Sequence, residues 1–92
     1  MTREIRAFKL VTGEEVIASA EKVELGWELE KPFVVKMIPT PNGLAPIMGQ
    51  WLITATATSF FVPHRLVILD FEPGTDVMDV YIRQTTNIQI AR

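Results

Sequence analysis

Alternation of apolar and polar positions is the main signal in the first forty residues. From 27 to 37 the sequence reads WELEKPFVVKM, in which every odd position except Lys31 is apolar. A period of two places the odd positions on one face of a half-buried strand. We expect this strand to cover 27–38. Because Pro32 has no N–H to donate to a ladder, the strand should bend or leave a sheet edge there.

Shorter strands are predicted before this one. Residues 5–11 (IRAFKLV) form the first, with Phe8 and Leu10 on the buried face. A turn at 12–15 (TGEE) follows, where Gly13 supplies a permissive backbone. Residues 16–23 (VIASAEKV) form the next strand, which ends at a turn over 24–26 (ELG). The first half of the chain therefore reads as successive antiparallel strands joined by short turns.

The second half is expected to add strands and one helix. Breaker residues at 39–46 (PTPNGLAP) predict a loop, and 52–61, rich in Thr, Ile and Phe, predicts a strand. After a turn at 62–65, the segment 66–71 (LVILDF) is so apolar that it should be buried on both faces or paired at a subunit interface. Thr75 or Asp76 can cap a helix over 77–84. Residues 85–92 predict a short added strand or an ordered tail.

This order of elements predicts a mainly β fold. Five strands with a strongly bent first half fit a small antiparallel barrel of the SH3-like or OB-like kind, followed by a short C-terminal helix. Ninety-two residues make one domain, with the barrel over about 5–71 and the helix and tail over about 75–92.

The composition indicates that the protein assembles with other subunits. Hydrophobic residues make up 48% of the chain and charged residues 22%, so part of the apolar surplus should lie at a subunit interface. The chain has no Cys, which excludes a disulfide framework and thiolate metal sites. Without a long apolar run or a signal-peptide pattern, we expect a soluble cytoplasmic protein that binds no membrane. The net charge of −2 gives no overall basic footprint for nucleic acid, so RNA binding would need a local basic spot.

The strand order and turns resemble the Sm-like (LSm) family of ring-forming, RNA-associated proteins, which includes the bacterial host-factor type. LVTGEEVIA at 10–18 matches the first half of the family's first motif, and ELGWEL at 24–29 stands where Asp-x-x-Met-Asn is expected. FVPHRLVIL at 61–69 lies in register with the second motif, with His64 at the bacterial His. The resemblance covers about 5–71 and is greatest to the divergent, acidic members of phage type.

This sequence also departs from the family pattern. Thr12 replaces the motif Asp, Glu28 replaces the Asn that reads a uracil edge, and Val62-Pro63 replaces Arg-Gly. The C-terminal helix stands in place of the family's N-terminal one. The resemblance implies a homo-oligomeric ring of about five to seven subunits, in which the fourth strand of one subunit pairs with the fifth of the next. It also implies RNA at the pore or on one face, in the cytoplasm of a host cell if the protein is phage-encoded.

Candidate RNA-binding residues follow from this resemblance. They are Trp27, Glu28, His64 and Arg65. An Arg can grip phosphate while His stacks on a base, and Trp27 lies where the family stacks a side chain beside the base. Each has an alternative reading: His64-Arg65 is a polar turn without a ligand, Trp27 is a core residue, and Glu28 repels phosphate. The expected subunit-interface residues are Phe60, Leu66, Val67, Ile68 and Leu69.

An enzyme is not expected. The carboxylates lie in turns or on a solvated face, with one His and no nucleophile to complete a constellation, and we expect no metal and no cofactor. The alternative to an RNA-binding ring is an oligomeric barrel that serves as a structural or protein-interaction module. Its partner surface would then be the helix around 77–82 and the tail at 88–90.

Overall fold

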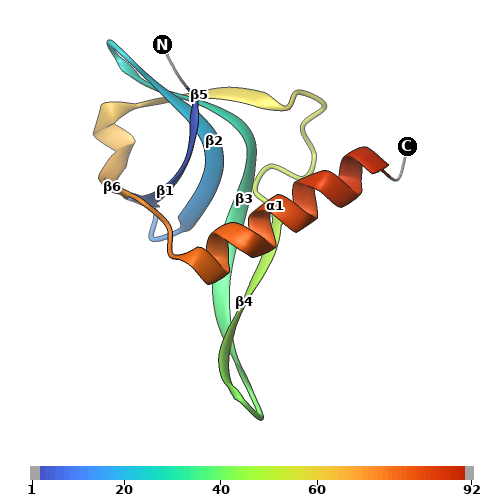
Figure 1. Cartoon of the computed structure of the whole chain (residues 1–92). Helices are drawn as coiled ribbons and strands as arrows, with labels where there is room; N and C mark the ends of the chain where they lie inside the picture. Colours follow the sequence, from blue (N-terminus) through green and yellow to red (C-terminus); the bar gives the residue numbers. More distant parts are fainter. Residues whose placement is uncertain (1–2, 91–92) are drawn as a thin grey trace.

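One bent antiparallel sheet and a single long helix make up the fold of residues 3–90 (Figure 1). The computed structural model describes residues 3–90, and side chains as far as residue 86. The strands are β1 (Glu4–Leu10), β2 (Glu15–Val23), β3 (Gly26–Thr40), β4 (Gly43–Gln50), β5 (Ser59–Pro63) and β6 (Val67–Phe71). A 3-10 turn, η1 (His64–Leu66), joins β5 to β6, and the helix α1 covers Thr75–Ile90. The prediction of a mainly β fold with one C-terminal helix is confirmed.

Strand β3 joins the parts of the sheet because it pairs with two different strands along the same edge. The strand order is β4-β3-β2-β1-β6, and β5 also pairs with β3. The first half of β3, up to Glu30, pairs with β5, and the second half, from Phe33, pairs with β4. Between the two halves lies an irregularity at which Lys31 adopts a φ of 53°. The bend expected at Pro32 is therefore present, one residue after this strained position.

Both faces of β2 are buried, so the sheet has two apolar cores. Val16, Ala18 and Ala20 point to the concave side, where they pack with Phe8 and other core residues. That concave core comprises Phe8, Leu10, Val16, Ala18, Ala20, Trp27, Leu29 and Val62. Ile17 points to the opposite side, against α1. The prediction that Phe8 and Leu10 are buried is confirmed, with exposed fractions of 1% and 4%.

Tyr81 fixes the helix to the outer face of the sheet. Its ring is 3% exposed and meets Phe33 edge-on, with 5.8 Å between the ring centroids. Its hydroxyl donates to the Lys31 carbonyl oxygen at 2.9 Å and accepts from the Ser19 N–H at 3.1 Å. One phenol oxygen therefore joins α1, β2 and the irregularity in β3.

The segment predicted as a loop at 39–46 is instead a hairpin. β3 continues to Thr40, and β4 begins at Gly43 after a turn made by Pro41 and Asn42. Gly43 has a φ of 113°, which only glycine adopts without strain. The same Pro, Asn and Gly residues that predicted a loop also suit the tight turn and edge strand of a hairpin.

Three other boundaries differ from the predictions. The strand expected over 52–61 begins only at Ser59, because 51–58 is irregular and has no strand to pair with in the described chain. The helix begins at Thr75 and continues to Ile90, which replaces the expected strand or tail up to that residue; residues 91 and 92 lie outside the described chain. Between residues 3 and 90, β5 and β6 do not pair, so the six-stranded sheet stays open where a closed five-stranded barrel was expected.

Tyr81 is the only tyrosine in the sequence, so its ionisation can be followed without interference. Burial raises the pKa of Tyr81 from 10.0 to about 12. A pKa raised on folding gives stability that is full below pH 10 and is lost as the pH rises towards 12. We expect tyrosinate absorbance to appear near pH 12 in the folded protein and near pH 10 in denaturant.

The control for this experiment is Tyr81→Phe. Removing the hydroxyl leaves the Ser19 N–H and the Lys31 carbonyl without this partner, so the free energy of unfolding should decrease by about 1–3 kcal/mol. The free energy of unfolding of the wild type should fall between pH 10 and 12 as Tyr81 ionises. The variant has no tyrosine, so it should not show this part of the fall. A tyrosine that titrates near pH 10 in the folded protein would contradict this arrangement.

Candidate oligomerisation edges and nucleic-acid site

The two ends of the strand network meet at η1. β5 is paired with β3 and β6 is paired with β1, and neither has a partner on its other side within the described residues. Only the three residues of η1 separate the two strands along the chain. An open strand edge presents backbone N–H and C=O groups that can pair with a strand from another chain.

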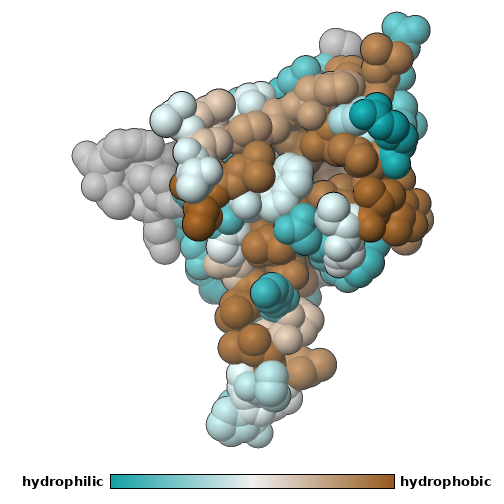
Figure 2. Space-filling view, turned by 180° about the vertical axis from the view of Figure 1, so that it is seen from behind, coloured by the Kyte–Doolittle hydropathy of each residue, from teal (hydrophilic) through white to brown (hydrophobic). Residues whose placement is uncertain are grey.

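Large apolar side chains are exposed around these edges. Phe61 on β5 is 48% exposed, and Ile68 and Leu69 on β6 are 63% and 58% exposed. The edge surface consists of Val11, Leu25, Phe61, Leu66, Ile68 and Leu69. Hydrophobic residues are visible on the rim of the body in Figure 2. The edges thus combine unsatisfied backbone groups with apolar side chains.

The predicted interface residues divide into exposed and packed ones. Leu66, Ile68 and Leu69 are exposed, so the alternative that 66–71 is buried on both faces is wrong for the single chain. Val67 packs against the concave core instead. Phe60 is half-buried and lines a cavity of about 250 Å³ beside the break in β3. Sequence reasoning missed Phe61, because only the pairing register shows which of the two phenylalanines faces outward.

Close backbone contacts hold η1 and its flanking strands in place. Gly26 lies opposite Pro63, so near that a Cβ on Gly26 would meet the Val62 carbonyl oxygen and come within 2.7 Å of the Pro63 Cα. The His64 N–H donates to the Leu25 carbonyl at 3.2 Å. These contacts connect the start of β3 to the end of β5.

β6 is tied to β1 by an ion pair. The Arg6 Nη2 lies 2.8 Å from the Asp70 Oδ2, and the Val11 N–H donates to the Leu66 carbonyl at 3.0 Å. Because both groups of the ion pair are partly exposed, the pair contributes modestly to the free energy of unfolding. Its larger effect is to fix where β6 lies on the sheet.

The structure places the four predicted RNA-binding residues on two neighbouring elements, η1 and the start of β3, with different exposure. His64 and Arg65 are both exposed on η1, and Arg65 forms no ion pair with any described residue. Glu28 lies on the neighbouring strand, opposite Phe61, and is half-buried. Trp27 is only 5% exposed, so little of its ring is open to a base, and its role as a base-stacking residue stays a prediction.

Trp27 is a member of the concave core. Its ring meets that of Phe8 edge-on, with centroids 5.0 Å apart, and Lys22 Nζ lies 5.9 Å from the centroid of the indole. Core burial was the alternative reading of this residue from the sequence, and it is the one that the packing supports.

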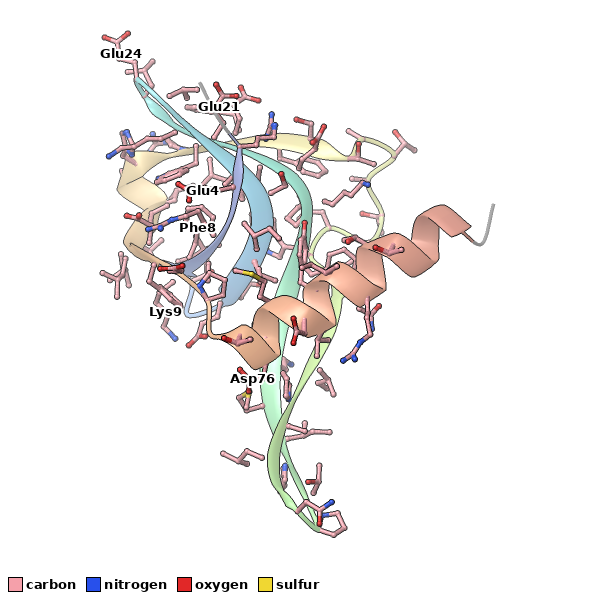
Figure 3. All side chains as sticks on the ribbon, viewed as in Figure 1. Glu4, Phe8, Lys9, Glu21, Glu24 and Asp76 are labelled. Atoms are coloured by element: carbon pink, nitrogen blue, oxygen red, sulfur yellow. The ribbon has the colours of Figure 1, made fainter. Side chains whose placement is uncertain are left out.

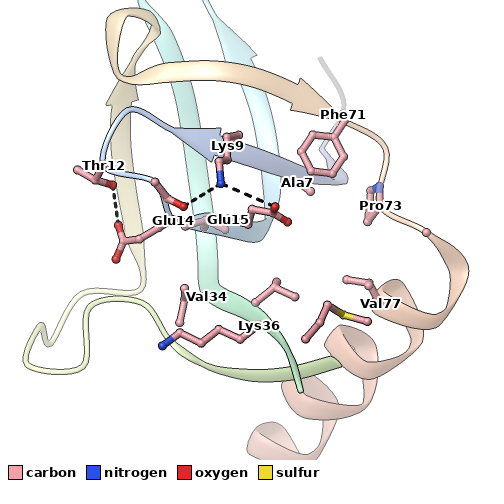
Figure 4. A pocket seen from close by; sticks show the side chains of 15 residues that line it. Ala7, Lys9, Thr12, Glu14, Glu15, Val34, Lys36, Phe71, Pro73 and Val77 are labelled. Carbon is pink, nitrogen blue, oxygen red and sulfur yellow. Dashed lines mark hydrogen bonds and ion pairs between the residues drawn. The ribbon is translucent and has the colours of Figure 1, made fainter. Parts of the chain in front are cut away.

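A cavity of about 470 Å³ lies between the β1–β2 turn, β3 and the start of α1 (Figure 4). Its polar groups bind one another: Lys9 Nζ donates to the Gly13 carbonyl at 3.0 Å, and Thr12 Oγ1 donates to Glu14 Oε1 at 3.0 Å. Figure 3 shows the side chains of the described residues. Among these residues, no three His, Asp or Glu side chains form a group that could hold a metal ion. The one helix of that part is not long and apolar enough to cross a membrane.

Comparison with protein-family models and with curated proteins gives no match to this chain. The resemblance of residues 5–71 to Sm-like proteins therefore stays a prediction.

The tight approach at Gly26 gives a direct test of how the edge is held. Gly26→Ala should lower the free energy of unfolding by about 1–3 kcal/mol, because the new methyl group meets the β5 backbone, which cannot move aside cheaply. Chemical denaturation would measure the loss. Gly49→Ala in β4 is the matched control, since a Cβ there meets nothing within 4 Å and should change stability little. Equal effects of the two substitutions would contradict the packing.

Proposed function

We propose that the protein is a non-enzymatic, Sm-like subunit that assembles into a homo-oligomeric ring. In this assembly β5 of one subunit pairs with β6 of the next, and the bent sheet closes between chains instead of within one. The observation that carries the proposal is the pair of open strand edges, joined by η1 and flanked by exposed apolar side chains.

A ring follows from the use of two different edges. When one surface of a subunit binds a different surface of its neighbour, the contact repeats head to tail and closes if the rotation per subunit allows it. Burying each large apolar side chain of the edge surface is worth about 1.5–3 kcal/mol, in addition to the backbone hydrogen bonds gained. Assembly would also remove two edges that otherwise invite aggregation.

The third open edge is less suited to strand pairing. β4 contains Pro46, and a proline on an edge strand has no N–H to offer an added strand. β5 carries proline only as its last residue, Pro63, and β6 carries none. The sequence therefore favours β5 and β6 as the strands that pair with other subunits.

RNA binding at the ring is the second candidate function. His64 and Arg65 lie on the connection between the two pairing strands, so every subunit junction would carry one copy of each. They are the only His, Lys or Arg residues between 37 and 69. Repetition around a ring concentrates this charge locally although each subunit has a net charge of −2. If no RNA binds, the ring is a structural or protein-interaction module.

Assembly is tested by light scattering coupled to size exclusion. The wild type should have a mass that is a multiple of 10.4 kDa, and Ile68→Lys should reduce that mass because a buried ammonium at the paired edge is costly. Ile82→Lys, which changes an exposed isoleucine on α1, is the matched control and should keep the wild-type mass. A wild-type monomer of 10.4 kDa would refute the ring.

RNA binding is tested by fluorescence anisotropy with short U-rich and A-rich RNAs at several salt concentrations. Arg65→Ala should weaken binding and lower the salt slope by about 0.7 for each subunit that contacts the RNA, since each such subunit loses one phosphate contact. Arg83→Ala, an exposed arginine on α1, should leave both quantities unchanged. Equal affinity of wild type and Arg65→Ala would remove Arg65 from the site, and no binding to either RNA would leave the structural module.

A further inference from the structure

The outer part of the β3–β4 hairpin projects from the body as an arm (Figure 1). We define the arm as Lys36–Thr40 paired with Gly43–Ile47. At its base, Val35 and Met48 pack against the buried cluster of Ile17, Phe33 and Tyr81 on the helix side of the sheet. Two strands alone are marginally stable in water, so an apolar arm of this kind gains stability when another surface covers it.

The exposed apolar side chains of the chain fall mainly into two groups. One is the edge surface. The other, which we name the arm surface, consists of Met37, Ile38, Leu44 and Ile47. Leu44 is 69% exposed. Leu52 and Ile53 are also exposed, but they lie on the 51–58 segment beyond β4 and not on the arm. Hydrophobic residues continue along the arm in the view of Figure 2. Their number and exposure exceed the scattered apolar residues of an ordinary surface.

Charge is excluded from the same region. No Asp, Glu, Lys or Arg occurs from 37 to 63, and every acidic residue lies within 4–30 or 70–79. The chain thus has a charged body, acidic overall, and an uncharged stretch that includes most of the arm and the 51–58 segment. A surface without charges loses little solvation when it is covered by another apolar surface.

We propose that the arm surface binds the arm surface of a second copy of this chain, in a contact separate from the pairing of β5 with β6. Two acidic copies repel each other where their carboxylates meet, and contact through the uncharged stretch keeps those carboxylates apart. Like surfaces meet in a two-fold contact, in which the same patch serves both partners.

The arms meet through side chains and not through strand addition. Pro46 deprives the β4 edge of one backbone donor, so the contact depends on apolar side chains such as Leu44 and Ile47. These two residues lie on opposite faces of the arm, because neighbouring positions in a strand alternate. The arm therefore has an exposed apolar side chain on each of its two faces, and the double substitution Leu44→Glu/Ile47→Glu places a charge on both.

Other occupants fit the surface less well. Proteins that lie on membranes usually surround their apolar residues with Lys and Arg, and the arm carries only Lys36. Nucleic acid needs cations that the stretch from 37 to 63 does not contain. If β5 and β6 also pair as proposed, two-fold arm contacts join subunits of different rings, and the particle has twice the mass of one ring.

Four proteins compared by light scattering coupled to size exclusion test this contact separately from the ring. They are the wild type, the arm variant Leu44→Glu/Ile47→Glu, the edge variant Ile68→Lys, and the combination of both. The arm variant should have half the wild-type mass, the edge variant should be a dimer of twice 10.4 kDa, and the combination should be a monomer of 10.4 kDa. Gln84→Glu/Thr86→Glu adds the same charge on exposed positions of α1 and should keep the wild-type mass.

The outcomes distinguish the two contacts. An arm variant with the wild-type mass, or an edge variant that is monomeric, overturns the arm contact and leaves the ring to be judged on its own. A halved mass for the arm variant together with an unchanged mass for the edge variant supports the arm contact and refutes β5–β6 pairing.

Chemical denaturation of each variant checks that it is folded. Sedimentation of the wild type, but not the arm variant, with phosphatidylcholine–phosphatidylserine vesicles, at unchanged mass, would assign the surface to a membrane and overturn the proposal.

Discussion

The break in β3 is the constraint on which the other features depend. One side of this strand must serve β5 before Lys31 and β4 after Pro32, so the chain cannot continue there as a regular ladder. The irregularity turns the Lys31 N–H towards the Thr58 carbonyl at 2.8 Å and its carbonyl towards Tyr81. Lys31 and Pro32 therefore bind the helix on one face of the sheet and the 51–58 segment beside it. They also mark the point at which the sheet divides into a body and an arm.

Local periodicity predicted the part of the fold in which burial follows the sequence pattern. Phe8 and Leu10 lie on either side of the partly exposed Lys9, and their face was predicted correctly because a strand has a period of two. The 52–58 segment shows similar alternation of Ala and Thr, yet it forms no strand, because β propensity has effect only beside a partner. The hairpin at 39–46 was missed for the opposite reason: Pro39 and Pro46 lie on strands with few neighbours, where proline is tolerated, and Pro41 lies in the turn between them.

The candidate site could be predicted from the sequence only in part. The exposed His64-Arg65 turn and the exposed Leu66, Ile68 and Leu69 could be predicted, because a short apolar run beside a polar turn stands out in any register. Trp27 could not be assigned, because the contact that buries it comes from Phe8, nineteen positions earlier in the chain. Long-range packing of this kind leaves no local signal.

The position of β6 has a consequence for how the protein folds. β6 completes its place in the sheet by pairing with β1, and the ion pair between these strands joins residues 64 positions apart. Contacts between distant parts of a chain form slowly, because a long loop must close before they yield any free energy. During synthesis β1 emerges before β6, so the edge of β1 that pairs with β6 stays open until β6 has also been made. This open edge of β1 can pair with other strands in the meantime, and it is therefore a part of the nascent chain that needs protection.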